Sequence, residues 1–241
     1  MHELPSVATL LDWVRQGHRR LEEELGKLAP DALAQPSILP GWTRGHIVTH
    51  LARNADGLCN LLYWARTGER TPMYPSYEVR NYAIERGAGR PLPEQLEDLE
   101  GASARFVEAA EQLDDGQWDA TVETVQGQSM PARQVPWMRA REVWVHLGDL
   151  DLGLRESPLP DPVARALLED VTRWRDRTTS ERVTLHAPGM PELSFGGSRG
   201  QQPVEISGSA PDLVAWLTGR SPGTDLDVAA PHALPVLSRW L

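Results

Sequence analysis

The sequence predicts an α+β protein of two domains, in which an N-terminal four-helix bundle precedes a smaller C-terminal α/β domain. Three observations support this prediction. Apolar residues recur at helical spacing in several long segments before residue 152, a run with three prolines follows at residues 153–162, and short segments typical of strands come after that run. We therefore place the bundle at residues 1–155 and the α/β domain at residues 160–241.

The first two bundle helices have clear signals at their ends. Ser6 can cap a helix that ends near Gly26. Thr43 can cap a second, longer helix that ends at Gly68. In the first helix, apolar side chains follow helical spacing at Leu10, Leu11, Val14, Leu21 and Leu25. Both segments are therefore expected to be amphipathic helices.

Two further long helices complete the predicted bundle. After a short helix at residues 77–86, Pro93 stands at the start of a helix whose apolar positions continue to Leu113. Alternation in the segment TVETVQGQSM indicates a brief hairpin or an extended excursion of the chain. The last bundle helix is expected from about Pro136 to Leu152, where Gly153 closes it.

The C-terminal domain is expected to combine helices and strands. Asp161 and Pro162 open a helix that continues through Arg177. Strands are expected in the segments RVTLHA, ELSFG and PVEISGS. Ser209 then begins a last helix, which ends at Gly219.

Composition restricts the class of partner. The 241 residues include 24 Lys and Arg against 34 Asp and Glu, and this net charge of −10 disfavours a nucleic-acid binder that relies on overall positive charge. No apolar run is long enough for a membrane span, and the segment MHELPSVATLLDW lacks the basic start of a signal peptide. Cys59 is the single cysteine, so no internal disulfide can form. We expect a cytoplasmic protein with a small-molecule partner and no membrane association.

Two pairs of residues predict a metal site. His46 and His50 stand four residues apart in the second helix, and Glu142 and His146 stand four apart in the last bundle helix, so each pair projects from one helical face. At ~100° per residue, His50 and the second pair border the apolar faces of their helices. Two histidines and a carboxylate with an open position are typical of catalytic zinc, and a metal would offset the cost of burying them. Chance spacing on solvated helix surfaces is the alternative explanation.

Three neighbouring residues have more than one interpretation. His46 could be a metal ligand, a donor that orients a ligand, or a structural group at the helix N-terminus, and we favour the last two. Asp149 could orient a ligand imidazole or lie in solvent, and we favour solvent. Cys59 lies about 180° from His50 around the helix, so we interpret it as a packing residue rather than a nucleophile.

Four segments of the chain resemble one enzyme family. The segments GWTRGHIVTH, LCNLLYWARTGERTPMY, WMRAREVWVHLGDL and SGSAPDLVAWLTGR are similar to mycothiol-dependent maleylpyruvate isomerases of gentisate breakdown. The similarity extends over nearly the whole chain. It implies a monomer with a DinB-like bundle and an α/β domain. It also implies that His50, Glu142 and His146 bind zinc and that Arg220 is catalytic.

The resemblance implies reversible addition of a small thiol, most simply mycothiol, to maleylpyruvate. Adding a thiolate makes the double bond single, rotation follows, and expulsion of the thiolate leaves fumarylpyruvate, the trans isomer. Zinc would deprotonate the thiol, and Arg220 would hold a substrate carboxylate or the developing enolate charge. Arg80 could hold the second carboxylate of this dicarboxylate, although a solvated arginine is the simpler interpretation.

Other assignments stay open at this point. Related enzymes use other thiols such as ergothioneine, and no motif in the sequence selects between them. A metal-dependent thiol S-transferase could share the same ligands but would consume its thiol. A metal-binding regulatory module is disfavoured because structural zinc sites are usually closed by four protein ligands. A zinc hydrolase would lack an evident general base.

Overall fold

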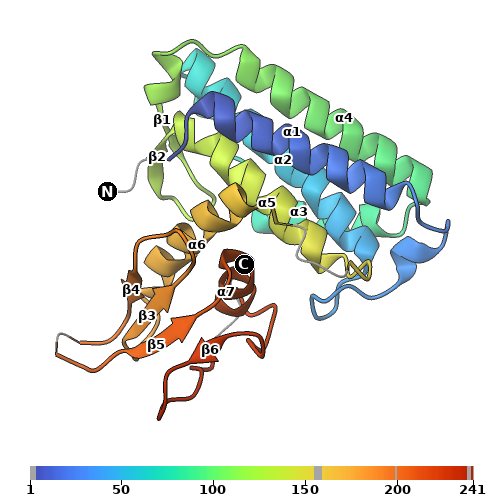
Figure 1. Ribbon diagram of the computed structural model, residues 1–241. Coiled ribbons are helices and arrows are strands. Elements are labelled where there is room, and N and C mark those ends of the chain that lie inside the picture. The colour runs from blue at the N-terminus through green and yellow to red at the C-terminus, as the bar shows by residue number, and fades with distance from the viewer. Residues whose placement is uncertain (1–3, 155–158, 199, 238–239, 241) are drawn as a thin grey trace. The chain divides into compact units, whose positions relative to one another are not determined.

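The chain divides into two units, Met1–Leu154 and Arg155–Leu241, which are described here one at a time (Figure 1). This computed structural model describes residues 4–154, 159–198, 200–237 and 240. The first unit is mainly helical, and the second combines a four-stranded sheet with two helices. Both agree with the predicted α+β class. Within the described ranges, we find no helix with the length and apolar character that crossing a membrane requires.

Four long helices pack against one another in the first unit (Figure 1). They are α1 (Val7–Leu25), α2 (Arg44–Thr67), α4 (Leu92–Glu111) and α5 (Val135–Asp149). α2 contacts both α4 and α5, and α1 contacts the same two helices. The predicted four-helix bundle is therefore confirmed, and a shorter helix, α3 (Tyr77–Ala88), packs on α2.

Short elements join the bundle helices. Two strands, β1 (Thr121–Glu123) and β2 (Ser129–Pro131), form the antiparallel hairpin that the sequence predicts between α4 and α5. Three single turns of 3₁₀ helix lie at η1 (Ala32–Ala34), η2 (Gln117–Asp119) and η3 (Ala132–Gln134). The hairpin directs the chain from α4 back into α5, which carries two of the candidate metal ligands.

Three of the predicted cap residues, Ser6, Thr43 and Gly68, stand at the ends of α1 and α2. The Ser6 hydroxyl accepts a hydrogen bond from the backbone N–H of Thr9 at 3.2 Å. The Thr43 hydroxyl accepts one from the backbone N–H of His46 at 3.4 Å, and Gly68 ends α2 in the left-handed conformation at φ 76°. These groups satisfy backbone atoms that have no partner within the helix, so α1 and α2 begin where predicted.

The last bundle helix ends earlier than predicted. The sequence predicts that this helix continues to Leu152, before Gly153, whereas α5 ends at Asp149. Backbone carbonyls at this end accept hydrogen bonds from outside the helix, because the Ile38 N–H donates to Asp149 O at 3.1 Å and Arg44 Nε donates to Leu150 O at 2.8 Å. These partners, from the segment before α2 and from the first residue of α2, replace a further helical turn, and α5 ends three residues after His146.

The close approach of α3 to α2 depends on a glycine. A Cβ atom at Gly87 would lie 2.4 Å from Cγ2 of Thr49, a separation that atoms do not tolerate. The side chain of Thr49 also donates to Gln95 at 3.2 Å, which ties α2 to α4. Packing at this short distance brings the start of α3, with Arg80, toward the middle of α2.

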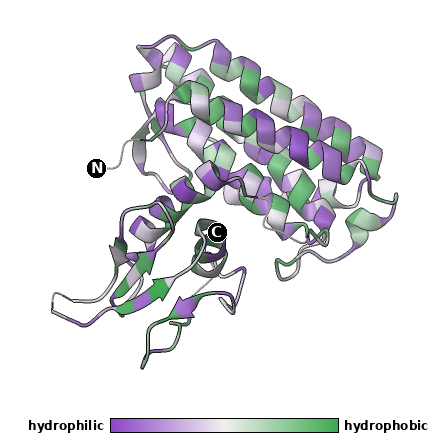
Figure 2. Ribbon diagram, viewed as in Figure 1, coloured by the Kyte–Doolittle hydropathy of each residue, from purple (hydrophilic) through white to green (hydrophobic). Residues whose placement is uncertain are grey.

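The bundle interior is mainly apolar, and one of the polar networks within it is centred on Arg139. Figure 2 shows hydrophilic and hydrophobic residues together along each bundle helix. The fully buried apolar side chains include Leu10, Leu21, Ile47, Leu51, Leu58 and Phe106. Burial of such side chains is the main favourable term in folding, at about 25 cal/mol for each Å² removed from water. The polar network among them must therefore be well satisfied.

Arg139 joins the members of that network and is fully buried on α5. Its guanidinium donates to Leu51 O at 2.7 Å and to Asn54 Oδ1 at 2.9 Å, both on α2. It also contacts His18 Nε2 on α1 at 3.3 Å, and His18 Nδ1 lies 2.8 Å from the Ser103 hydroxyl on α4. Because arginine only donates, His18 accepts at Nε2 and donates from Nδ1 to Ser103. The network therefore links all four bundle helices.

The second unit is an α/β domain with a mixed sheet. Its elements are α6 (Asp161–Arg175), β3 (Val183–His186), β4 (Leu193–Phe195), β5 (Val204–Ser207), α7 (Ala210–Leu217) and β6 (Asp227–Val228). The strand order is β4-β3-β5-β6, with β3 and β5 parallel and the outer pairs antiparallel. Helices and three strands match the prediction, whereas the two residues of β6 are too few to show a strand pattern. Arg175 ties α6 to α7 by donating to Leu217 O.

We predict that His18 makes the bundle less stable in acid. Burial, with a smaller contribution from Arg139, holds the pKa of His18 well below its ordinary value, so this ring stays neutral in the folded chain. The unfolded chain takes up a proton near pH 6.5, so His18 lowers the free energy of unfolding as the pH falls below that value. Between pH 7 and pH 5 the loss should be at most roughly 2 kcal/mol, the limit for a histidine that stays neutral in the folded chain.

The variant His18→Gln tests this prediction, because glutamine can still accept from Arg139 and donate to Ser103 but does not titrate. Urea denaturation at pH 7 and pH 5 should show a smaller acid loss in the variant than in the wild type. Equal losses in the two proteins would contradict the assignment.

Candidate metal centre

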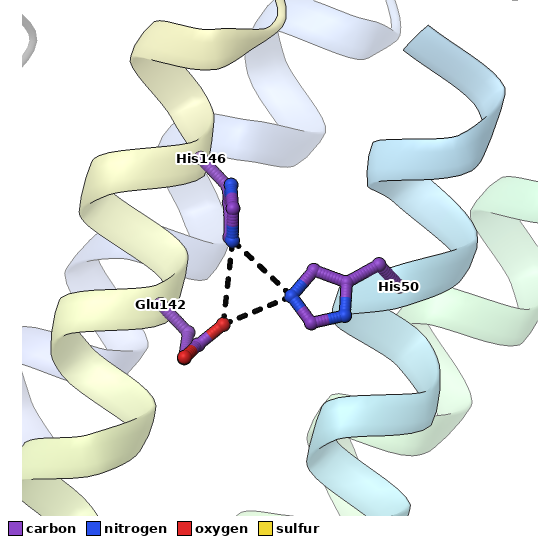
Figure 3. A group of neighbouring side chains, drawn as sticks. All are labelled: His50, Glu142 and His146. Atoms are coloured by element: carbon purple, nitrogen blue, oxygen red, sulfur yellow. Dashed lines mark hydrogen bonds and ion pairs between the residues drawn. The ribbon is translucent and has the colours of Figure 1, made fainter. Parts of the chain in front are cut away.

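Three side chains from two bundle helices converge in the first unit (Figure 3). His50 comes from α2, and Glu142 and His146 come from successive turns of α5. His50 Nε2 lies 2.9 Å from Glu142 Oε2 and 3.1 Å from His146 Nε2, and the last two atoms are 3.3 Å apart. The structure thus brings together the three residues that the helix faces single out, and we refer to them as the triad.

The triad has the dimensions of a tetrahedral metal site. At metal–ligand distances of ~2.0–2.1 Å, the ligand atoms of tetrahedral zinc lie ~3.3 Å from one another, close to the three separations in the triad. Both histidines are about 5% exposed, and the Glu142 side chain is 13% exposed. Two imidazoles and one carboxylate leave one coordination position for another molecule. The donor set therefore fits a divalent metal with an open position.

Charge within the triad depends on a proton held by His146. Burial lowers the pKa of His50 to about 4, so that ring is neutral at pH 7. Burial also acts against charge on His146, but hydrogen bonds to Asp149 and Glu142 raise the pKa of this histidine to about 9. Glu142 stays ionised, since hydrogen bonds from the two histidines outweigh its burial and hold its pKa well below the usual value. A metal that binds all three must displace the His146 proton.

Asp149 is a buried partner of the triad, and its interpretation as a solvated residue was wrong. Its side chain is fully buried, and Oδ2 lies 2.8 Å from Nδ1 of His146. Asp149 is the last residue of α5 and follows His146 by three positions, so the two side chains lie on the same face of the helix. The Asp149 carboxylate accepts a hydrogen bond from Nδ1 of His146, so Nε2 of the same ring faces His50 and Glu142. Carboxylates commonly orient metal-binding histidines in this way.

Arg80 contacts the triad from α3 and is half-buried, so the interpretation as a solvated arginine was also wrong. Its Nη2 lies 3.1 Å from His50 Nδ1. Arginine only donates, so this ring nitrogen accepts and the neutral His50 ring carries its proton on Nε2. The guanidinium carbon of Arg80 also lies 5.8 Å from the Tyr74 ring centre. A positive charge therefore stands next to the triad.

His46 stands outside the triad and has a structural role. Its Nδ1 accepts from the backbone N–H of Thr43 at 3.1 Å, which completes the cap of α2. Its Nε2 faces Glu85 at 3.4 Å. Trp42 stacks on this ring at 6.0 Å and meets the His50 ring edge-on at 5.6 Å. The structure thus favours a structural role for His46 over its interpretation as a metal ligand.

Cys59 and Arg220 lie outside the triad. Cys59 is half-buried on α2, and burial raises the pKa of its thiol to about 11, so it is protonated at neutral pH. In the second unit, Arg220 donates to Trp240 O at 2.9 Å and to Thr218 O at 3.3 Å. The catalytic role of Arg220 stays a prediction.

Sequence reasoning missed two aromatic residues around the triad. Trp42 immediately precedes the cap residue of α2, a position where a side chain can pack against the first turns of the helix. Tyr74 lies in the loop before α3, and no periodic pattern marks it. The position of Trp42 beside Thr43 could have suggested its contact with His50, whereas the contact of Tyr74 with Arg80 depends on the folded loop.

Comparison with known proteins relates both units to one family. Residues 14–151 match the model of the mycothiol maleylpyruvate isomerase N-terminal domain, and residues 159–239 match the C-terminal domain of the same family. A crystal structure of the mycothiol-dependent maleylpyruvate isomerase is 32% identical, covers 98% of each chain and has a TM-score of 0.87. A histidine-to-alanine mutant of such an isomerase has 31% identity, the same coverage and a TM-score of 0.85.

A more distant structure shows the fold alone. YfiT from Bacillus subtilis, described as a probable metal-dependent hydrolase with an unusual four-helix bundle topology, is 15% identical. The match covers 64% of this chain and 91% of the YfiT chain, with a TM-score of 0.53. No curated protein sequence gives a significant match. On the two domain matches and the 32% identity over 98% of its length, the chain belongs to the mycothiol-dependent maleylpyruvate isomerase family.

Proposed function

We propose that the protein catalyses the thiol-dependent cis–trans isomerisation of maleylpyruvate to fumarylpyruvate, with mycothiol as the thiol and zinc held by His50, Glu142 and His146. The main support is a triad of metal-binding geometry in a chain that is 32% identical, over 98% of its length, to an isomerase of that name. Zinc at this site would lower the pKa of a bound thiol, so that thiolate forms at neutral pH.

The thiolate is the group that makes isomerisation possible. It adds to an alkene carbon conjugated with a carbonyl group, and the electron pair of the double bond moves to the carbonyl oxygen as an enolate. Rotation about the new single bond follows. Return of the electron pair expels the thiolate and leaves the trans alkene, so the thiol is regenerated. Positive groups that face the enolate and the carboxylates of the substrate would lower the barrier.

Arg80 is suited to bind one of these carboxylates. In the structure its guanidinium donates to Nδ1 of His50. When Nε2 of a neutral histidine binds a metal, the ring proton lies on Nδ1, which can no longer accept from Arg80. The guanidinium is then available for a carboxylate next to the metal centre, and Arg220 is our candidate for the catalytic group on the second unit.

We also propose that the enzyme is a cytoplasmic monomer. The single cysteine forms no internal disulfide, which suits a reducing compartment where a small thiol stays free. The monomer follows from the family resemblance of the sequence.

Isomerase activity with a recovered thiol tests the proposed function. With zinc and mycothiol, the protein should convert maleylpyruvate to fumarylpyruvate while the mycothiol concentration stays constant. The variant His50→Ala should lose tight metal binding and fall at least about 100-fold in kcat/KM, because a ligand is missing. His46→Ala, one turn away on the same helix, should keep both. Consumption of the thiol, or full metal binding by His50→Ala, would contradict the proposal.

The proposed role of Arg80 predicts that its loss weakens substrate binding but does not weaken zinc binding. Arg80→Gln should raise the KM for maleylpyruvate about tenfold or more, because a charge-assisted contact with a carboxylate is lost. Zinc affinity, measured by competition with a chelator, should stay equal or increase, because the competing hydrogen bond to His50 is weakened. Arg86→Gln, on the same helix and hydrogen-bonded to Tyr82, is the matched control. Weaker zinc binding by Arg80→Gln would show that Arg80 supports the metal ligand instead.

A further inference from the structure

A cavity of about 230 Å³ lies in the first unit between the end of α2, the loop before α3 and the β1–β2 hairpin. Three aromatic side chains line it: Trp64 from α2, Tyr74 from the loop and Tyr77 from the start of α3. Arg70 and Glu123 also line it and form an ion pair at 2.7 Å. We refer to this cavity as the aromatic pocket. None of its residues belongs to the triad.

The loop that forms one wall of the aromatic pocket is held against α2. A Cβ atom at Gly57 would lie 2.8 Å from Cε1 of Tyr74, so only a glycine lets the tyrosine ring approach the helix this closely. Asn60 donates to the backbone carbonyls of Pro72 and Met73 at 3.3 and 3.2 Å. The position of Tyr74 is thus determined by contacts with α2 on two successive turns.

The aromatic pocket and the triad are neighbours. Tyr74 lines the pocket, and its ring centre is 5.8 Å from the guanidinium carbon of Arg80. Arg80 in turn contacts His50 at 3.1 Å. One tyrosine and one arginine side chain therefore separate the pocket from the nearest triad residue. A molecule whose reactive group reaches the metal could place its other end in the pocket.

The lining suits a ring that carries several hydroxyl groups. Such a ring has apolar C–H faces, which pack on aromatic rings, and hydroxyls at its edge, which both donate and accept hydrogen bonds. Trp64 is half-buried and Tyr77 is 50% exposed, so aromatic surface is available. Glu123 accepts hydrogen bonds, Arg70 donates them, and the half-buried Thr124 can do either.

A quaternary ammonium group fits the same lining less well, although aromatic rings often bind such cations. The guanidinium of Arg70 already lies 5.5 Å from the Trp64 ring centre, and that of Arg80 lies 5.8 Å from the Tyr74 ring centre. Glu123 is paired with Arg70. A further cation would meet two positive charges and a carboxylate that is already neutralised.

We propose that the aromatic pocket binds the glucosaminyl-inositol part of mycothiol while its cysteine sulfur reaches the metal centre. This assignment rests on the proposed function, and it explains how the protein can select a glycosylated thiol over ergothioneine, which carries a trimethylammonium group. Trp64 and Tyr77 contact the faces of the sugar or inositol ring. Arg70 and Glu123 bind its hydroxyl groups.

Calorimetric binding of N-acetylglucosaminyl-inositol, which has no thiol and whose amide is uncharged like that of mycothiol, to the metal-loaded protein tests the pocket without turnover. The wild type should bind it. Trp64→Leu and Tyr77→Ser should each raise the Kd about tenfold, because an aromatic contact is lost. Tyr82→Ser is the matched control, since Tyr82 is a second exposed tyrosine of α3, outside the pocket lining. In isomerase assays, the same two variants should raise the KM for mycothiol and leave kcat near its original value.

The two measurements separate failure of the pocket from failure of the proposed function. Isomerisation with an unchanged KM for mycothiol in both Trp64→Leu and Tyr77→Ser would overturn the pocket assignment and leave the function intact. Pocket-dependent binding of N-acetylglucosaminyl-inositol without isomerisation would support the pocket and reject the function. Absence of glycoside binding, or pocket-dependent binding of ergothioneine in its place, would overturn the assignment.

Discussion

The ionised carboxylate of Glu142, largely covered between α2 and α5, is the constraint on which the metal centre depends. A charge removed from water is costly unless opposite charge and hydrogen bonds compensate it. Here His50 and His146 lie 2.9 and 3.3 Å away, and the proton that His146 holds is balanced in turn by Asp149. A divalent cation in place of that proton would satisfy the same ligand atoms with more charge. The arrangement is therefore poised to exchange a proton for a metal.

The distances between the triad atoms also require that α2 and α5 keep a fixed position along each other. Arg139 meets this requirement, because it stands one turn before Glu142 on α5 and donates to Asn54, one turn after His50 on α2. The same guanidinium extends the connection to α1 through His18. A buried arginine is costly in itself, and its burial lowers its pKa to about 10. The network thus links the stability of the bundle to the geometry of the metal centre.

The residues of the triad could be predicted from the sequence, but the residues around it could not. Helical periodicity alone places His50, Glu142 and His146 on inward faces, because α2 and α5 are both amphipathic helices. Asp149 was misjudged because its burial depends on tertiary packing at the end of α5, where the Ile38 N–H donates to its backbone carbonyl. The contact of Arg80 with His50 depends on how closely α3 packs on α2. Such long-range contacts leave no periodic signal in the chain.

Zinc titration of the metal-free protein, followed by calorimetry in two buffers of different ionisation enthalpy, tests the triad most directly. With the pKa of His146 at about 9, zinc that binds at pH 7 must release the proton of this histidine. We therefore predict one zinc per chain, about one proton released at pH 7, and an affinity that rises about tenfold per pH unit between pH 6 and pH 8 before levelling off above pH 9. Failure to bind zinc, or an affinity independent of pH over that range, would contradict the metal centre described here.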